Sequence, residues 1–286
     1  MITVTDPCVL AGVSDADYHS DKMVPGGSLS STGVRRILAS PALYRWQIEH
    51  PVEKAVFDTG KAVHAEVLGT GAQTVVIPED LLALNGAAST VAAKKFIAEA
   101  YLDGQVPLKA AEFAPIKAMA AAVLDHRTAR ALLERPGIPE ASAFARDPLT
   151  GTWLRARPDY LPDRTERRTI AVDLKTGRSA DPRKFRRAVA EYGYHQQAAL
   201  YTDVVRWARG DDDVAFVFVV VEVTPPHLVS VCELDPDAMN VGRSRNRTAI
   251  ELYARCRETG QWPGYGTEIH TIDLPAWATY DQETVL

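Results

Sequence analysis

The stretch Ala171-Val172-Asp173-Leu174-Lys175-Thr176 decides the fold of this 286-residue chain, because its apolar and charged residues alternate. A period of two predicts a β-strand with Asp173 and Lys175 on one face and Val172 and Leu174 on the other. A carboxylate and an ammonium group on the same face can form a plain ion pair or half of a metal site. The neighbouring residues must decide between these two alternatives.

A second acid lies upstream, in Arg157-Pro158-Asp159, at the end of the apolar-leaning run 152–156. The residues between it and the first stretch, 161–169, are polar and suit a hairpin turn. Closing that hairpin would bring Asp159 near Asp173. Two carboxylates and a lysine are a set of side chains that can hold Mg²⁺ and activate a water molecule.

Two helical elements add polar side chains. Gln197-Ala-Ala-Leu-Tyr201 lies in a predicted helix from about 193 to 209, so Gln197 and Tyr201, four residues apart, share one face. Gly60-Lys-Ala-Val-His64 opens a predicted helix that ends near residue 68. A single helical histidine is more often a core or surface group than a ligand, so His64 depends on its context for any role.

In this order along the chain, the four elements resemble the signature of the PD-(D/E)xK nucleases of the RecB-like branch. The longer string Tyr194-His-Gln-Gln-Ala-Ala-Leu-Tyr201 looks most like the RecE-type exonucleases (exonuclease VIII) of phages and prophages. The resemblance covers roughly residues 28–265. It implies an α/β (α+β) fold with a restriction-endonuclease-like core, in which helices flank a mixed central sheet and a helical region precedes it.

The resemblance also implies a role for each motif residue. The metal ligands would be His64, Asp159, Asp173 and the backbone carbonyl of Leu174, and the metal would be Mg²⁺, for which Mn²⁺ can substitute. Lys175 would orient or deprotonate the attacking water, and the sequence does not separate these two roles. The expected catalytic residues are Asp159, Asp173, Lys175, Gln197 and Tyr201, the last two positioning Lys175 or contacting the phosphate backbone.

The implied activity is Mg²⁺-dependent exonuclease digestion of linear duplex DNA with a free end, in the 5′-to-3′ direction. The 3′ overhang would pass to a single-strand annealing protein in phage-type homologous recombination, and the enzyme would be a homo-oligomeric ring. Two alternatives remain open. One is a non-catalytic DNA-binding module on a nuclease fold. The other is a nuclease subunit of a helicase or adaptation complex, although the chain carries no helicase motif.

The net charge of −5 excludes a broadly basic DNA-coating protein. A local basic cluster nevertheless follows the lysine motif, and we expect it to face DNA rather than to be a plain solvated helix face. To it we add His195, which lies beside the glutamine motif. The residues expected to bind DNA are Arg178, Arg183, Lys184, Arg186, Arg187 and His195.

The composition of the chain bears on the cellular compartment in which we expect the protein to work. No apolar run is long enough to span a bilayer, and the N-terminus lacks the pattern of a signal peptide. The three cysteines, Cys8, Cys232 and Cys256, match no zinc or disulfide spacing, which favours a reducing bacterial cytoplasm, with phage or prophage origin implied by the resemblance. No Gly-rich phosphate loop occurs, so no nucleotide cofactor is expected.

We expect a single nuclease domain over residues 1–286. Its predicted parts are an N-terminal lead-in with helices (1–58), the His-bearing helix and a helical subdomain (59–135), the catalytic sheet core (136–265) and a C-terminal tail (266–286). The first core strand is predicted at Glu140–Arg146. Glu140 itself is either an extra acid near the metal or a charged strand start. The tail could pack on a neighbouring subunit, which the sequence does not decide.

Overall fold

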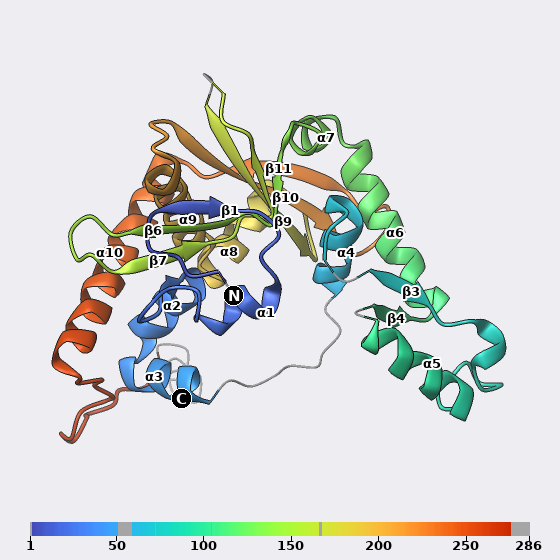
Figure 1. Cartoon of the computed structure of the whole chain (residues 1–286), viewed down its shortest axis with the longest axis horizontal. Coiled ribbons are helices and arrows are strands. Elements are labelled where there is room, and N and C mark those ends of the chain that lie inside the picture. Colours follow the sequence, from blue (N-terminus) through green and yellow to red (C-terminus); the bar gives the residue numbers. More distant parts are fainter. Residues whose placement is uncertain (1, 51–58, 72, 104, 166–167, 276–286) are drawn as a thin grey trace, which may run out of the picture.

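The computed structural model describes residues 2–50, 59–71, 73–103, 105–165 and 168–275. Its centre is a five-stranded sheet in the order β11-β10-β9-β8-β5 (Figure 1). The strands are β5 (Gly137–Pro139), β8 (Tyr160–Pro162), β9 (Thr169–Gly177), β10 (Val214–Glu222) and β11 (Val229–Glu233). In this sheet β9 and β10 run parallel to each other, and the antiparallel pairing of the other strands makes the sheet mixed, as predicted.

The two faces of this sheet carry different apolar cores. On β10, Phe216, Phe218 and Val220 belong to one buried cluster, while Val217 and Val219 belong to another. The first cluster includes residues of α9 (Tyr194–Arg209), and the second includes residues of α4 (Thr59–Leu68) and α6 (Ala110–Asp125). A strand buried on both faces reads as a continuous apolar run, which is why β10 was predictable.

A second, four-stranded sheet has the order β1-β6-β7-β2. Its strands are β1 (Cys8–Leu10), β2 (Leu29–Ser30), β6 (Ser142–Arg146) and β7 (Trp153–Ala156). The β6–β7 hairpin forms at the predicted turn, Asp147–Gly151, where Gly151 adopts a positive φ of 69°.

The predicted strand from Glu140 to Arg146 is wrong at its start. Glu140 has a φ of 48°, in the left-handed region that interrupts a strand. It separates β5 from β6, and the two strands then enter different sheets. Its backbone N–H donates to the carbonyl of Asp159 at 2.8 Å, so the break in the chain helps to place the segment that carries this acid.

Helices cover the two sides of the strands. Figure 1 shows α4, α6 and the outlying α5 (Val91–Leu102) on one side of β9, and α2 (Ser31–Ala39) and α10 (Pro236–Thr259) on the other. The remaining elements are α1 (Asp15–Ser20), α3 (Pro41–Glu49), α7 (Arg127–Leu133), α8 (Pro182–Glu191), the 3₁₀ turn Glu79–Leu81, β3 (Thr74–Val76) and β4 (Val106–Leu108).

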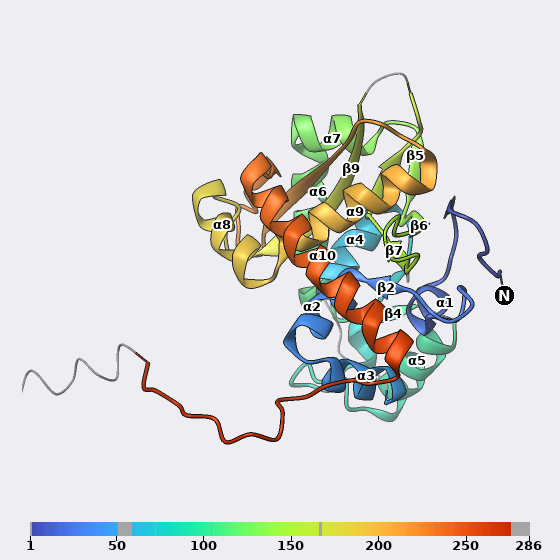
Figure 2. The same ribbon diagram turned by 90° about the vertical axis from the view of Figure 1, so that its left-hand side faces the viewer.

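The predicted parts of the domain contribute residues to the same two apolar cores. The His-bearing region packs on the five-stranded sheet through α4 and α6, and α2 of the N-terminal region shares the other core with α9. Of the predicted parts, residues 51–58 and 276–286 lie outside the described residues. After α10 the chain first contacts α3, where Trp262 stacks on Tyr44, and then runs away from the body (Figure 2).

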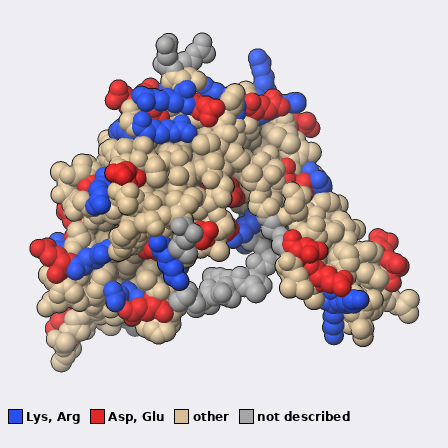
Figure 3. All heavy atoms as spheres, in the orientation of Figure 1, with Lys and Arg blue, Asp and Glu red and all other residues tan. Residues whose placement is uncertain are grey.

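The surface has no broad basic face in the view of Figure 3, where lysine and arginine side chains are interspersed with acidic ones. The same view shows a hollow between α1 and α4, next to β9. In the part of the chain that the structure describes, no helix is long and apolar enough to cross a membrane.

Candidate active site

Strand β9 presents the central acid and lysine as the alternation predicts. Val172 and Leu174 belong to the core on the α4–α6 side, while Asp173 lies opposite Phe218, whose ring is in the core on the α9 side. Asp173 is almost completely buried, at 2% exposure. Its Oδ2 atom contacts the ammonium group of Lys175. A carboxylate this deeply buried needs such partners, because burial of an unpaired charge is costly.

The second acid reaches the same strand. Asp159 lies between β7 and β8, and its Oδ2 accepts a hydrogen bond from the backbone N–H of Leu174 at 2.6 Å. Tyr160 of β8 pairs antiparallel with Val172 of β9, so the predicted hairpin closure does bring Asp159 beside Asp173.

His64 also lies beside these two strands. On α4, His64 places Nε2 2.8 Å from the carbonyl oxygen of Leu174 and Nδ1 3.4 Å from Asp159 Oδ2. The imidazole therefore contacts two of the other three expected ligands. No spacing in the sequence relates residue 64 to residue 174, and the contact arises because α4 packs on the sheet.

Gln197 contacts the acid that pairs with Lys175. Its side-chain amide donates to Asp173 Oδ1 at 2.7 Å. The glutamine therefore orients Asp173 and, through that acid, Lys175, while its phosphate contact stays a prediction. Together with the Lys175 ammonium on Oδ2, it engages both oxygens of the Asp173 carboxylate.

Tyr201 is a correction. It is buried, with its ring edge-to-face with Phe216 at 5.7 Å, and its hydroxyl lies close enough to Tyr18 and to the backbone of Arg157 to interact with both. Burial raises the pKa of the Tyr201 phenol well above its ordinary value. A phosphate contact is excluded by this burial, so Tyr201 supports the segment just before Asp159.

Sequence reasoning missed the partner of that tyrosine. Tyr18, on α1, lies under the guanidinium of Arg157, whose carbon is 4.0 Å from the ring centroid. Arg157 also bonds to Ser142 Oγ at 2.8 Å and to Asp15 at 2.9 Å. These contacts hold the chain two residues before Asp159, and no motif in residues 1–27 announces them.

The electrostatics of the site separate the roles of its ionisable groups. Burial, helped by the neighbouring Asp173, raises the pKa of Asp159 to about 6, although His64 and Lys175 act to lower it. Burial also acts to lower the pKa of Lys175, but Asp173 and Asp159 outweigh it and raise that pKa. Lys175 is therefore an ammonium ion at neutral pH, which favours an electrostatic or orienting role over that of a base.

The donor set suits a hard divalent cation. Two carboxylates and a backbone carbonyl are oxygen ligands of the kind Mg²⁺ takes, and an imidazole is compatible with Mn²⁺. Among the described residues, no group of three or more His, Cys, Asp or Glu side chains already converges as a metal site. His64 and the Leu174 carbonyl contact each other, so both can hold one ion only if that contact opens.

The predicted DNA-binding residues fall into two classes. The arginines and lysine of α8 and the preceding loop are exposed: Arg178, Arg183, Lys184, Arg186 and Arg187. Arg183 is paired with Asp181, the N-cap residue of α8. His195, in contrast, is buried and its Nδ1 lies 3.1 Å from the carbonyl of Val189. The structure makes His195 a core histidine and removes it from the DNA-contacting set.

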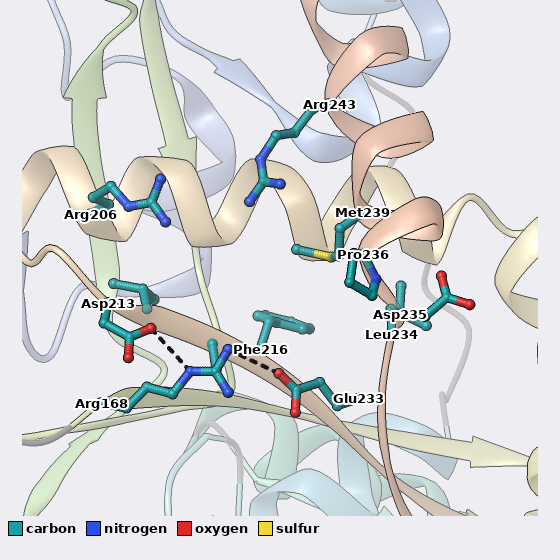
Figure 4. A pocket seen from close by; sticks show the side chains of 12 residues that line it. Arg168, Arg206, Asp213, Phe216, Glu233, Leu234, Asp235, Pro236, Met239 and Arg243 are labelled. Carbon is teal, nitrogen blue, oxygen red and sulfur yellow. Dashed lines mark hydrogen bonds and ion pairs between the residues drawn. The ribbon is translucent and has the colours of Figure 1, made fainter.

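The polar cavity shown in Figure 4 lies elsewhere in the molecule. It measures about 540 Å³ and lies at the start of β10, between α9 and α10, rather than beside Asp173. Arg168 crosses it and pairs with Asp213 at 3.1 Å and Glu233 at 3.2 Å. These pairs neutralise the cavity locally, so it does not extend the site.

Comparison with known proteins identifies the family of this chain. A model of the family described as "PDDEXK-like domain of unknown function (DUF3799)" matches residues 30–275. The chain belongs to this family. The α+β nuclease-type fold and the PD-(D/E)xK resemblance of the sequence are thereby confirmed, since the PDDEXK-like domain takes in Asp159, Asp173 and Lys175.

Solved structures include similar folds for this PDDEXK-like domain. A protein of Eubacterium rectale, described as a candidate exonuclease, superposes with a TM-score of 0.57 at 10% identity, covering 96% of this chain and 99% of that chain. An alkaline exonuclease of Laribacter hongkongensis gives 0.27 at 15% identity, covering 69% and 95%, which is too low a score to carry an argument. No curated protein matches in sequence.

Proposed function

We propose that this PDDEXK-like domain is a metal-dependent DNA exonuclease of the RecE type, which hydrolyses phosphodiester bonds of linear duplex DNA. The single observation that supports this most is the meeting of Asp159, Asp173 and Lys175 at β9, with His64 on the Leu174 carbonyl. The Eubacterium rectale protein, described as a candidate exonuclease and similar in fold over nearly the whole chain, is consistent with the proposal.

A divalent cation, Mg²⁺ or Mn²⁺, would be held by His64, Asp159, Asp173 and the Leu174 carbonyl, and would supply Lewis-acid stabilisation of the phosphate. Lys175 would orient the attacking water and offset the negative charge that grows on the phosphate oxygens. Gln197 keeps the Asp173 carboxylate turned toward the site. The water oxygen bonds to phosphorus, the bond to the departing sugar oxygen breaks, and a proton passes from the water to that oxygen.

The finer features of the proposal follow from the family resemblance. They are 5′-to-3′ digestion, a 3′ overhang passed to a single-strand annealing protein in phage-type recombination, and action in the cytoplasm of a bacterial host. DNA would be held by the exposed cluster of the α8 region. A non-catalytic DNA-binding module is the competing function, and the intact set of His64, acids and lysine is what argues against it.

The deciding experiment uses end-labelled linear duplex with Mg²⁺, with Ca²⁺ and with EDTA. We expect cleavage in Mg²⁺ alone, and its loss in Asp173→Asn, which keeps the side-chain volume but removes the charge. Asp212→Asn is the matched control, because this acid is exposed in the loop before β10. Binding of DNA by the wild type without cleavage under any metal would establish the binding module instead.

A further inference from the structure

The ammonium group of Lys175 contacts the aromatic ring of Tyr194, a residue to which the nuclease motifs assign no role. Its Nζ atom lies 4.8 Å from the ring centroid of Tyr194 and 5.9 Å from that of Phe218. Tyr194 is the first residue of α9, three residues before Gln197 and hence on nearly the same helix face. One helical turn therefore carries both the amide that holds Asp173 and the ring that contacts Lys175.

The ring is fixed from several sides. Its centroid lies 5.9 Å from that of Phe185, 5.5 Å from that of Phe218 and 5.7 Å from that of Tyr192. A side chain caught among three other rings has little rotational freedom. Tyr194 is nevertheless only half-buried, so these ring contacts do not enclose it completely.

The turn that begins α9 is also fixed. Gly193 has a φ of 67°, and a Cβ atom there would come within 2.7 Å of the Arg35 side chain. Arg35, on α2, donates to the carbonyl of Tyr192. The guanidinium thus ties the start of α9 to α2, so the position of the Tyr194 ring is set by tertiary contacts.

The ring acts as a neutral π system. Burial raises the pKa of the Tyr194 phenol, so at neutral pH the group facing Lys175 is a phenol and not a phenolate. The attraction is then between an ammonium ion and the face of a ring, which persists when the hydroxyl is removed. A packing role alone would require only bulk at this position.

We propose that Tyr194 is a positioning residue whose ring face holds the Lys175 ammonium beside Asp173. This inference rests on the proposed nuclease function, since it assigns the ring to the lysine of that site. A lysine ammonium ends a flexible four-carbon stem and would otherwise sample several rotamers. Asp173 holds it from one side and Tyr194 from another, so the ammonium stays where the phosphate charge develops.

The test compares four variants with the wild type. Tyr194→Phe keeps the ring, while Tyr194→Leu and Tyr194→Met keep apolar bulk without a π face, and the second of these serves if the first fails to fold. Tyr101→Leu is the matched control, because it removes an exposed tyrosine ring of α5, away from the rings that surround Tyr194.

The first measurement does not depend on activity. In metal-free protein with ¹³Cε-labelled lysine, assigned with Lys175→Arg, the Hε protons of Lys175 should be shifted upfield by ring currents. We expect the shift to persist in Tyr194→Phe and Tyr101→Leu and to shrink in Tyr194→Leu and Tyr194→Met. An unchanged Lys175 resonance in the latter two would overturn the inference.

The second measurement is the rate on linear duplex. A cation–π contact of this kind corresponds to a rate loss of about 2- to 30-fold. We expect that loss in kcat, with little change in KM, for Tyr194→Leu, and near wild-type rates for Tyr194→Phe. An undiminished kcat in Tyr194→Leu beside an active wild type refutes the positioning role alone. An inactive wild type in every metal would instead refute the proposed function, and the NMR comparison would still test the ring contact.

Discussion

Asp159 shows how burial at a single residue couples the candidate site to pH. Its carboxyl pKa rises from 3.8 to about 6, chiefly because the group is buried. A raised pKa means that the folded state prefers the protonated form. The stabilising contribution is therefore fully present below about pH 4 and is lost as the pH rises through 6.

The direction of this pH dependence can be tested by urea unfolding of the metal-free protein in EDTA. Asp159→Asn is neutral at every pH, so at pH 7.5 it should unfold at a higher urea concentration than the wild type. Its free energy of unfolding should exceed that of the wild type by roughly 3 kcal/mol at most. The difference should shrink steadily as the pH falls from 6.5 to 4. A difference that is constant with pH would show that Asp159 is not the titrating group. Saturating Mg²⁺ should reduce it at pH 7.5, because an ion bound to the ionised carboxylate stabilises the wild type.

Lys175 provides the second test at the residue scale. Its ammonium contacts Asp173 within the fold and is expected to interact with the phosphate mainly in the transition state. Lys175→Ala should therefore lower turnover by orders of magnitude while changing the affinity for duplex DNA, measured by anisotropy in Ca²⁺, only a few-fold. Equal losses in both would make Lys175 a phosphate-gripping residue. Lys184→Ala on the exposed face of α8 is the matched control, in which we expect the affinity to change more than the turnover.

At the scale of elements, α9 combines two functions on one helix. Gln197 faces Asp173, whereas Tyr201, one turn later, faces Tyr18 and the backbone of Arg157. Tyr201→Phe removes only the hydroxyl, so we expect a loss of about 1 kcal/mol of stability in urea unfolding and no change in DNA affinity. A large loss of DNA affinity with unchanged stability would restore the phosphate contact that the sequence suggested.

Gln197→Ala should behave differently, weakening Mg²⁺ binding in calorimetry because Asp173 loses its orienting partner.

The elements that the sequence predicts are those with a local pattern. Strand β9 alternates, β10 is continuously apolar and the β6–β7 hairpin has its turn residues, so each follows from a short window. The break at Glu140 and the short strand β4 have no such pattern, because each depends on contacts with distant segments. Helix α1 does have a local signal, since Ser14 caps it by accepting a hydrogen bond from the N–H of Asp17, but its contacts with the site depend on distant segments. Tyr18 illustrates this, since its partners Arg157 and Tyr201 come from two other parts of the chain.

The same distinction explains the site. Asp159, Asp173 and Lys175 were predictable as neighbours because one hairpin joins them. His64 required the packing of α4, and Tyr194 required the geometry of α9 against β9 and β10, so their contacts follow only from the assembled fold. His195 was misassigned for the same reason, because its place in the motif string says nothing about which side of α9 is buried.

At the scale of the whole molecule, the charge distribution limits how DNA can be retained. The net charge is −5, and acidic and basic side chains alternate over the face in Figure 3. Phosphate affinity comes from neutralised contacts and falls steeply with salt, so a chain with few such contacts would release duplex quickly. The exposed basic cluster around α8 is small, so something other than a basic surface must keep the duplex DNA bound.

A closed ring of copies around the duplex would retain DNA by topology rather than by charge, and cyclic homo-oligomers are common. We therefore expect light scattering to show an oligomer under active conditions, with each Arg183–Arg187 segment facing the channel. Linear duplex should be digested processively, while closed circles and duplexes capped by hairpins at both ends should survive. Processivity should also resist added salt better than initial loading does, since only loading depends on phosphate contacts. A monomer that cuts closed circular DNA rapidly would exclude threading and make the enzyme an endonuclease, with its acids and lysine in the same roles.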